Sequence, residues 1–302
     1  MVAFPILVIG AEGQLARALG RRKVVGGHPI LCRGRPDADI ADPRTLQRLF
    51  GELAPIAVVN AAAYTAVDKA EEDRATAFAV NAEGPEHLAR LCRNAQIPLI
   101  QISTDYVFDG TGRTPYRETD AIAPLGVYGA SKAAGEGAVR QTCPRHLILR
   151  TSWLYSMDGH NFLKSMIRLG AGHDELAIVD DQHGTPTWTH DISAAIVAIL
   201  RRVLAEEDGP WGTYHLTSSG QTTWLGFAAE IFRLGAAAGL KTPRLKAITT
   251  AEYPASVRRP AYSVLDNSKI AMTFDIRLPP WQMSLAQCFA HSQSLASEEK
   301  VA

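Results

Sequence analysis

The sequence predicts an α/β protein built on a doubly wound, mainly parallel sheet, with a smaller C-terminal α/β lobe. Three observations lead to this prediction. Short apolar segments alternate with longer amphipathic ones, a turn containing Gly10 and Gly13 follows the first apolar segment, and the alternation changes after Arg150. A chain that alternates strand and helix joins parallel strands by right-handed crossovers, which place helices on both faces of the sheet.

The predicted strands are apolar runs with little polar alternation, as expected for strands covered on both faces. They are residues 5–9, 29–32, 56–60, 99–103 and 146–150. Between them lie amphipathic segments of helical length. These segments predict helices over residues 14–22, 45–53, 73–94 and 128–141.

After Arg150 the segments are less regular, which predicts a second structural unit. Its expected elements are a helix, a strand and two further helices, at residues 161–169, 176–179, 191–204 and 224–235. We therefore expect one domain over residues 1–152 and a smaller lobe over residues 153–302. Some elements of about 176–204 are expected to return to the large sheet.

Composition favours work on small molecules. The 302 residues carry 31 basic and 31 acidic side chains, a net charge of zero, without a basic stripe for nucleic acid or anionic lipid. Four cysteines lack CxxC spacing, which argues against a disulfide framework and a zinc site. The apolar segment before Gly10 is too short for a membrane span and lacks signal-peptide features. These observations predict a cytoplasmic protein.

The turn at Gly10 and Gly13 has the composition of a phosphate-binding loop. Glycine lets backbone N–H groups approach a pyrophosphate closely, and the N-terminus of the following helix supplies partial positive charge. Ala16 is small where this helix must pack closely. A tight strand-to-helix turn without a ligand is the alternative. The turn makes the first strand-to-helix connection of a repeated unit, which favours a bound dinucleotide.

The segment after the second predicted strand indicates which dinucleotide binds. A fold that prefers NAD usually has an acid there, about 20 residues past the loop, whereas this chain has Arg33 and Arg35. Arginine pairs with a 2′-phosphate, so NADPH is predicted and NADH is possible; a solvated basic turn is the alternative. Asp39 and Ile40 are placed to flank an adenine, or equally to serve as a helix cap and a core residue.

Tyr128 and Lys132 form the predicted catalytic pair. A phenol has a pKa near 10, so it exchanges a proton at neutral pH only where its phenolate is favoured. The offset of four places both side chains on one helix face. There the ammonium would lower the pKa of the phenol and reach a cofactor ribose. A plain surface pair on a helix of small residues is the alternative.

Polar residues follow the predicted strand at residues 99–103. In open α/β sheets ligands bind beyond the carboxyl ends of the strands, so Thr104 and Asp105 should face the same crevice as the glycine loop. A hydroxyl at Thr104 can hydrogen-bond a carbonyl oxygen and the phenol of Tyr128. The alternative is a Thr104 hydroxyl that is satisfied by backbone.

Several motifs together resemble the extended short-chain dehydrogenase/reductase family and, within it, the dTDP-4-dehydrorhamnose reductases. The resemblance extends from the first strand to about Lys269, with the motifs in the order and spacing of that family. They are residues 10–15, 60–71, 103–110, 128–132, 150–155, 184–187 and 259–266. No single motif is convincing alone, but the set is highly specific.

The resemblance implies a Rossmann fold and reduction of dTDP-4-dehydro-L-rhamnose to dTDP-L-rhamnose by NADPH, the last step of a nucleotide-sugar route to polysaccharides. It implies that Tyr128 donates the proton, Lys132 binds the nicotinamide ribose and Thr104 tunes the phenol. The dinucleotide would be lined by Gly13, Gln14, Leu15, Asp39, Ile40, Ala63, Tyr64 and Thr65. The sugar nucleotide would contact Thr104, Asp105, Trp153 and, as a weaker assignment that a charged lid residue would also explain, Arg259.

The sequence departs from the family in two places. Ala16 stands where the family often has glycine, which a small residue should satisfy. Some members are magnesium-linked dimers that use a carboxylate on the first helix, but residues 17–20 offer none, so magnesium is left open, as is a monomer or homodimer. His183 and His190 lack the spacing of a helical metal-ligand pair and Asp191 suits a helix N-terminus, so no metal site is predicted.

Two other functions stay open from the sequence. One is a non-catalytic NADP-binding regulator, because the beta subunit of methionine adenosyltransferase has this fold and similar motifs. The other is a different sugar-nucleotide reductase or an epimerase; an epimerase would keep its cofactor bound and consume no NADPH. The presence of all the active-site residues favours the reductase.

Overall fold

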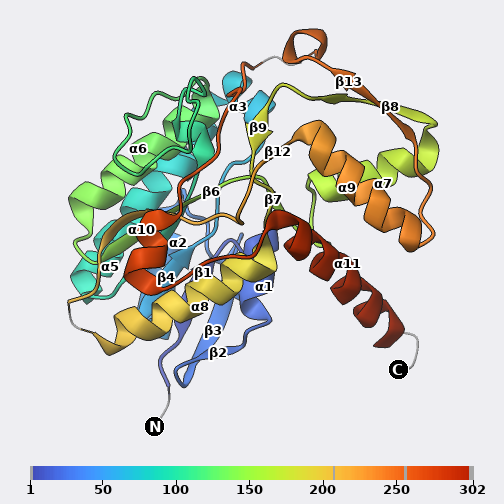
Figure 1. Ribbon diagram of the computed structural model, residues 1–302. Helices are drawn as coiled ribbons and strands as arrows, with labels where there is room; N and C mark the ends of the chain where they lie inside the picture. Colours follow the sequence, from blue (N-terminus) through green and yellow to red (C-terminus); the bar gives the residue numbers. More distant parts are fainter. Residues whose placement is uncertain (1–2, 207, 255–256, 299–302) are drawn as a thin grey trace.

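The computed structural model describes residues 3–206, 208–254 and 257–298 (Figure 1). Seven strands form its main sheet in the order β11-β6-β5-β4-β1-β3-β2. They are β1 (Ile6–Ile9), β2 (Val24–Val25), β3 (His28–Arg33), β4 (Ala57–Asn60), β5 (Leu99–Thr104), β6 (His146–Thr151) and β11 (Gly212–His215). All neighbours are parallel except β2 and β3. The doubly wound fold is confirmed, and the five predicted strands differ from the observed ones by at most one residue at either end.

The order of the strands fixes where a ligand can bind. The chain begins in the middle of the sheet with β1, adds β3 on one side, and then adds β4, β5 and β6 on the other. The loops after β1 and β4 therefore diverge, and this reversal leaves a crevice at the carboxyl ends of the two strands.

Successive apolar side chains of a strand point to opposite faces of the sheet, so both faces carry a hydrophobic core. In β1, Ile6 and Val8 join the core under α1 (Gln14–Gly20) and α8 (Thr189–Ala205), whereas Leu7 and Ile9 join the opposite core. The opposite core lies under α2 (Pro43–Leu53), α5 (Gly84–Ala95) and α6 (Val127–Thr142). Figure 1 shows α1 and α8 together on one face of the sheet and α5 and α6 on the other.

The predicted helix at residues 73–94 forms, but it is not a uniform α-helix. It consists of α4 (Arg74–Phe78), a π-helical segment (Ala79–Glu83) and α5. A short helix that the sequence pattern did not predict, α3 (Val67–Glu72), precedes it. π-Helical turns occur frequently at functional sites because they change the direction of side chains within a helix.

The rest of the chain forms a smaller lobe around a third core. Its elements are α7 (Phe162–Gly172), β8 (Glu175–Val179), α9 (Trp224–Ala237), β13 (Arg244–Ile248) and α11 (Trp281–Glu298). Short strand pairs join the lobe to the sheet: β7 (Leu154–Tyr155) with β10 (Thr187–Trp188), and β9 (His183–Gly184) with β12 (Thr222–Thr223). Helix α10 (Ser268–Phe274) follows later in the chain and packs against β11.

The segment 176–204 divides between the two units. Helix α8 packs against α1 on the large sheet, whereas β8 pairs with β13 in the smaller lobe. The strand of the C-terminal half that joins the main sheet is β11. The division of the chain at residue 152 stays a prediction.

Helix α6 lies unusually close to the π-helical segment, and glycine makes this possible. A Cβ on Gly135 would lie 2.1 Å from the backbone oxygen of Asn81, whereas a Cβ on Gly137 would have no described heavy atom within 4 Å. We expect Gly135→Ala to lower the free energy of unfolding by about 1–3 kcal/mol through overpacking. Gly137→Ala, the matched control in the same helix, should raise it by up to about 1 kcal/mol, because alanine restricts the unfolded chain. Chemical denaturation of both variants measures the difference, and equal effects would contradict this packing.

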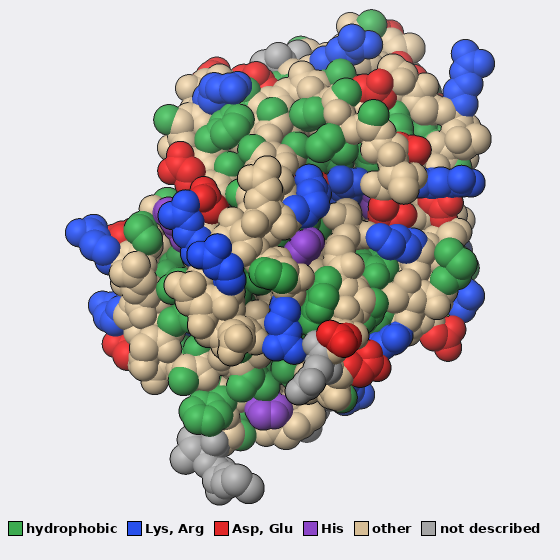
Figure 2. Space-filling model, turned by 90° about the vertical axis from the view of Figure 1, so that its left-hand side faces the viewer, with side chains coloured by type: hydrophobic (Ala, Val, Ile, Leu, Met, Phe, Trp, Pro, Cys, Tyr) green, Lys and Arg blue, Asp and Glu red, His purple; other side chains and the backbone are tan. Residues whose placement is uncertain are grey.

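The surface has mixed charge. Basic and acidic side chains are interspersed on the face shown in Figure 2 rather than gathered into a patch of one sign. None of the helices in the described part of the chain has the length and apolar character needed to cross a membrane.

Candidate active site

A cleft of about 1510 Å³ opens at the carboxyl ends of the strands. Pockets for a single small ligand usually measure about 300–1,000 Å³, so this cleft has room for two. The structure brings almost all of the predicted site residues into its wall. They are Gly10, Gly13, Gln14, Leu15, Asp39, Ile40, Ala63, Tyr64, Thr65, Thr104, Asp105, Tyr128, Lys132, Trp153 and Arg259.

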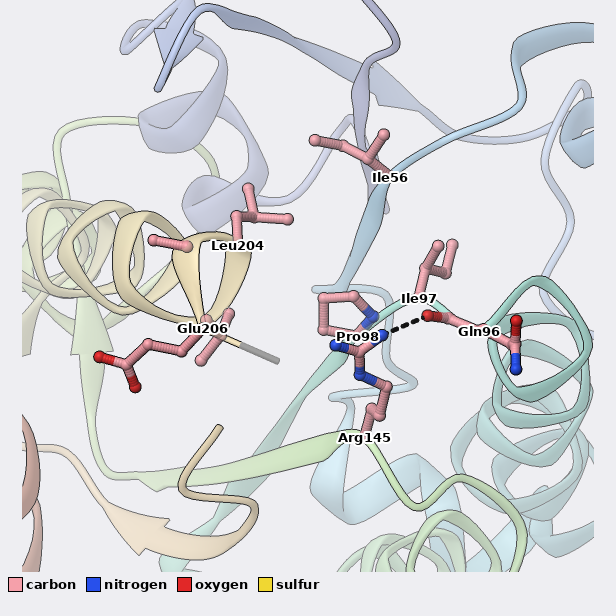
Figure 3. Close-up of a pocket in the computed structure, with 9 residues that line it drawn as sticks. Ile56, Gln96, Ile97, Pro98, Arg145, Leu204 and Glu206 are labelled. Atoms are coloured by element: carbon pink, nitrogen blue, oxygen red, sulfur yellow. Dashed lines mark hydrogen bonds between the residues drawn. The ribbon is translucent and has the colours of Figure 1, made fainter. Parts of the chain in front are cut away.

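A second cavity, of about 190 Å³, lies at the opposite edge of the sheet (Figure 3). Ile56 and Pro98, which precede β4 and β5, line it together with the end of α8. Arg145 Nη1 donates a hydrogen bond of 2.7 Å to the backbone oxygen of Gln96 there. This cavity is small and lies at the amino ends of the strands, whereas ligands in this kind of sheet bind at the carboxyl ends. It is therefore a poor match for a ligand site.

The glycine loop has the geometry of a phosphate cradle. Gly10 has a φ of +101°, and a Cβ there would lie 2.8 Å from the backbone nitrogen of Ala62, so only glycine fits. Its N–H and that of Ala11 donate to the backbone oxygen of Arg33, which fixes the loop. Helix α1 begins after Gly13, and within the described residues no side chain caps it. Its first N–H groups therefore face the cleft without an intramolecular cap, as pyrophosphate binding requires.

Of the predicted site residues, Arg33 does not line the cleft. The guanidinium of Arg33 donates a 3.0 Å hydrogen bond to the backbone oxygen of Cys32, and the cleft is lined by Gly34 and Arg35 instead. Arg33 is the last residue of β3, and its own backbone oxygen is engaged by the glycine loop. Arg35 is therefore the arginine that lines the cleft at this turn.

Of the roles that the sequence left open, Ile40 is a core residue, whereas Asp39 is not the cap of α2. Both line the cleft, and Ile40 is also buried in the core beneath α2 and α5. The carboxylate of Asp39 accepts a hydrogen bond from the N–H of Ala41, whereas the cap of α2 is Asp42.

Tyr128 meets the end of β5 because α6 approaches it through a glycine. A Cβ on Gly129 would lie 2.2 Å from the backbone oxygen of Tyr106. Thr104, the last residue of β5, lines the cleft together with Tyr128. Burial raises the pKa of Tyr128 to about 12, the Thr104 hydroxyl lowers it, and the Asp105 carboxylate raises it further. The phenol is therefore protonated at neutral pH.

The expected effect of Lys132 on this phenol is not what the structure shows. Lys132 Nζ donates a 2.6 Å hydrogen bond to the backbone oxygen of Ile102, and the net pKa of Tyr128 is raised rather than lowered. Burial lowers the pKa of Lys132 to about 8, and the Glu136 carboxylate opposes this. Lys132 lies in the cleft as predicted, but burial dominates the acidity of Tyr128 here.

Asn81, in the π-helical segment, holds the loop that lines the dinucleotide half of the cleft. Its side-chain oxygen accepts from the N–H of Tyr64 at 2.9 Å, and its side-chain nitrogen donates to the backbone oxygen of Tyr64 and to Ser131 Oγ, each at 3.0 Å. Sequence reasoning missed this residue, because its two partners are 17 and 50 positions away.

Gln14 has a structural task besides its predicted contact with the dinucleotide. Its Nε2 donates to the backbone oxygen of Leu154, and its Oε1 accepts from Ser156 and Asn161. Arg21, which directly follows the same helix, forms a bidentate ion pair with Asp158. The glycine-loop helix is thereby tied to the segment that follows Trp153.

Trp153 lies in the other half of the cleft, in a strained conformation. Its φ is +46°, and its ring stacks on Trp224 with centroids 3.5 Å apart and 5° between the planes. A Cβ on Gly184 would lie 2.4 Å from the Trp153 ring, which explains the glycine in the motif 184–187. Arg259 Nη2 pairs with Asp68 Oδ2 at 2.8 Å beside this half.

His190 and Asp191 each contact a neighbouring side chain. His190 stacks on Trp188, and Asp191 accepts a hydrogen bond from Ser284. Within the described residues, no three His, Cys, Asp or Glu side chains gather as metal ligands would.

Comparisons with known proteins agree with this geometry. The family described as RmlD substrate binding domain matches residues 4–294. A dTDP-4-dehydrorhamnose reductase of Sinorhizobium fredii is 44% identical over 280 residues, which cover 92% of this chain and 94% of that relative.

Two solved structures extend the likeness to three dimensions. The crystal structure of a dTDP-4-dehydrorhamnose reductase from Clostridium acetobutylicum has a TM-score of 0.88 and 40% identity, covering 96% of this chain and 99% of that one. The dTDP-4-dehydrorhamnose reductase from Bacillus anthracis in complex with NADP also has a TM-score of 0.88, with 33% identity, and covers 96% and 100% of the two chains.

Proposed function

The chain belongs to the RmlD substrate binding domain family, and from this premise we propose that it reduces dTDP-4-dehydro-L-rhamnose to dTDP-L-rhamnose with NADPH. One observation carries the proposal. Tyr128, Thr104 and Lys132 meet in the same cleft as the glycine loop, so a proton donor lies beside the place where a dinucleotide fits. NADPH supplies the hydride when it is bound.

The side chains of this cleft supply the rest of the chemistry. Tyr128, protonated at neutral pH, is suited to give its proton to the oxygen on C4 as that oxygen becomes an alkoxide. The Thr104 hydroxyl stabilises the phenolate left behind, and the cationic Lys132 adds positive charge nearby. Because this charge develops mainly in the transition state, its stabilisation raises kcat.

The residues that line the cleft fall into two groups, and we assign one group to each ligand. The glycine loop, Arg35 and the loop held by Asn81 surround the dinucleotide half. We assign Asp105, Trp153 and Arg259 to the sugar nucleotide, with the Arg259 guanidinium facing its pyrophosphate. The identity of these contacts follows from the family and from their common position in the cleft.

A spectrophotometric assay tests the function. We expect absorbance at 340 nm to fall when the protein is mixed with NADPH and dTDP-4-dehydro-L-rhamnose, with NADH giving a slower change. NADP binding without turnover would indicate a regulatory protein. Turnover of a sugar nucleotide without loss of NADPH would indicate an epimerase.

Arg35 should set the preference between the cofactors. We expect Arg35→Ala to raise KM for NADPH about three- to tenfold and to leave KM for NADH unchanged, because an exposed charge pair contributes about 1 kcal/mol. Arg33→Ala is the matched control and should change neither value, since its guanidinium donates to Cys32 outside the wall of the cleft. Steady-state kinetics with both cofactors measure this, and a larger effect at Arg33 would restore the original assignment.

We also propose a cytoplasmic location. All four cysteines, which lie in the described part of the chain, are free thiols, as a reducing compartment would keep them. A monomer or homodimer stays a prediction for the state of assembly.

A further inference from the structure

Asp105 is a buried carboxyl group with a hydrogen bond to only one of its two oxygens within the described structure. It follows β5, is 2% exposed and lines the cleft. Among the described residues, its Oδ2 has no hydrogen-bond partner. A buried carboxylate with an unpaired oxygen costs free energy, so its presence in a functional cleft calls for an explanation beyond stability.

The other oxygen connects Asp105 to the proton donor. Thr104 Oγ1 donates a 3.1 Å hydrogen bond to Asp105 Oδ1. Thr104 and Tyr128 line the same cleft, and the Thr104 hydroxyl lowers the pKa of the phenol. A hydroxyl has one donor and two acceptor positions, so it can accept the Tyr128 proton while it donates to Asp105. The Thr104 hydroxyl is therefore the group that can connect the Asp105 carboxyl group with the phenol.

The charges around Asp105 leave it able to hold a proton. Tyr128 from α6 and Tyr106 from its own turn face it, and Arg259, the cation that acts on Tyr106, is paired with Asp68. Burial raises the pKa of Asp105 to about 7, and the Ser263 and Thr104 hydroxyls oppose this. At neutral pH the carboxyl group therefore exists in both protonation states.

We propose that Asp105 is the proton reservoir that reloads Tyr128 through Thr104 after each reduction. The Tyr128 O–H bond breaks as its proton forms the new O–H bond on the C4 oxygen of the sugar. The Thr104 hydroxyl proton then passes to the Tyr128 oxygen, and the Asp105 carboxyl proton passes to Thr104. Asp105 recovers a proton from water when the product leaves. The relay transfers no electrons, because the hydride is the only redox step.

The inference rests on the proposed function and predicts a kinetic signature that a simple substrate contact would not give. In Asp105→Asn the phenol is loaded at the start, so at saturating sugar nucleotide the first hydride transfer should be faster than the turnovers that follow it, whatever the substitution does to substrate binding. Later turnovers should slow about tenfold, giving a burst of NADPH oxidation equal to one equivalent per site. The decrease of wild-type kcat as pH rises through about 7 should disappear in the variant.

Stopped-flow absorbance at 340 nm and pH profiles of kcat test this. Asp275→Asn is the matched control, because the Asp275 carboxylate is 93% exposed in its ion pair with Arg277, and it should behave as wild type. A first turnover in Asp105→Asn that is no faster than the later ones, or an unchanged kcat and pH profile, would overturn the relay alone. Absence of wild-type turnover would instead overturn the proposed function, and the relay with it.

A second variant tests the same idea if Asp105→Asn does not fold. Ser263→Ala removes a hydroxyl that lowers the pKa of Asp105, so the decrease in kcat should move to higher pH. A pH profile that does not move would count against the reservoir.

Discussion

Tyr128→Phe is expected to lower kcat by about a hundredfold or more while cofactor binding stays unchanged. Positioned proton transfer contributes about 10²–10⁴ to a rate, and phenylalanine keeps the ring but has no proton to give. The ring packs edge-on against Tyr106 with centroids 5.7 Å apart, so the fold of the cleft should persist. Steady-state kinetics give kcat, and titration of protein fluorescence with NADPH gives the affinity.

A second tyrosine provides the control for this variant. Tyr214 of β11 lies in the core beneath α8, and its hydroxyl donates to the backbone oxygen of Pro210. Tyr214→Phe removes a partly buried phenol away from the cleft and should keep kcat within about twofold. Near-normal turnover by Tyr128→Phe would remove Tyr128 from the mechanism.

Glu136→Gln is expected to lower the free energy of unfolding by about 3–5 kcal/mol. The Glu136 side chain is fully buried, and its two oxygens accept hydrogen bonds from Ser103 at 2.6 Å and from Arg150 at 2.9 and 2.7 Å. Glutamine has nearly the same size but leaves the buried Arg150 cation without its counter-charge. Arg140→Gln removes the more exposed partner of Glu136 and should cost less than about 1 kcal/mol.

The effect of Glu136→Gln should depend on pH in a defined direction. Burial raises the pKa of Glu136, but hydrogen bonds and charge from Arg150 outweigh it, so the folded-state pKa is lower than the ordinary 4.5. The carboxylate therefore stabilises the fold above pH 4.5, and this contribution is lost as pH falls through the lower folded-state value. The difference between wild type and variant should shrink in acid.

The titration of His215 also lowers stability in acid, in the wild type and in Glu136→Gln alike. Burial and the nearby Arg150 lower its pKa to about 3, so the folded state holds it neutral while the unfolded state takes up a proton below about pH 6.5. Both proteins share this loss between about pH 6.5 and 3. Urea unfolding at matched pH values isolates the part due to Glu136, and a difference that stays constant below pH 4.5 would contradict the buried ion pair.

The strands and most helices could be predicted because their signals are local. The apolar runs that form β1, β4 and β5 are bounded by polar or turn residues, so their ends are readable to within one residue. The glycine loop and the Tyr128 and Lys132 pair were equally readable, because each depends on spacing within a few residues.

The remaining features depend on contacts between distant parts of the chain. The ion pair of Glu136 with Arg150 joins α6 to β6, and the stack of Trp153 on Trp224 joins residues 71 positions apart. Whether Arg33 or Arg35 lines the cleft depends on the direction of the backbone after the end of β3. The pKa of Tyr128 depends on its burial, which spacing to Lys132 does not reveal. Such features require the packed structure.

Transfer of deuterium tests the central claim most directly. The protein should be given dTDP-4-dehydro-L-rhamnose and NADPH that carries deuterium at both positions on C4 of the nicotinamide, and the product examined by mass spectrometry and NMR. Direct hydride transfer predicts dTDP-L-rhamnose with one deuterium at C4 of the sugar. A product without deuterium, or with deuterium at another carbon, would contradict the account.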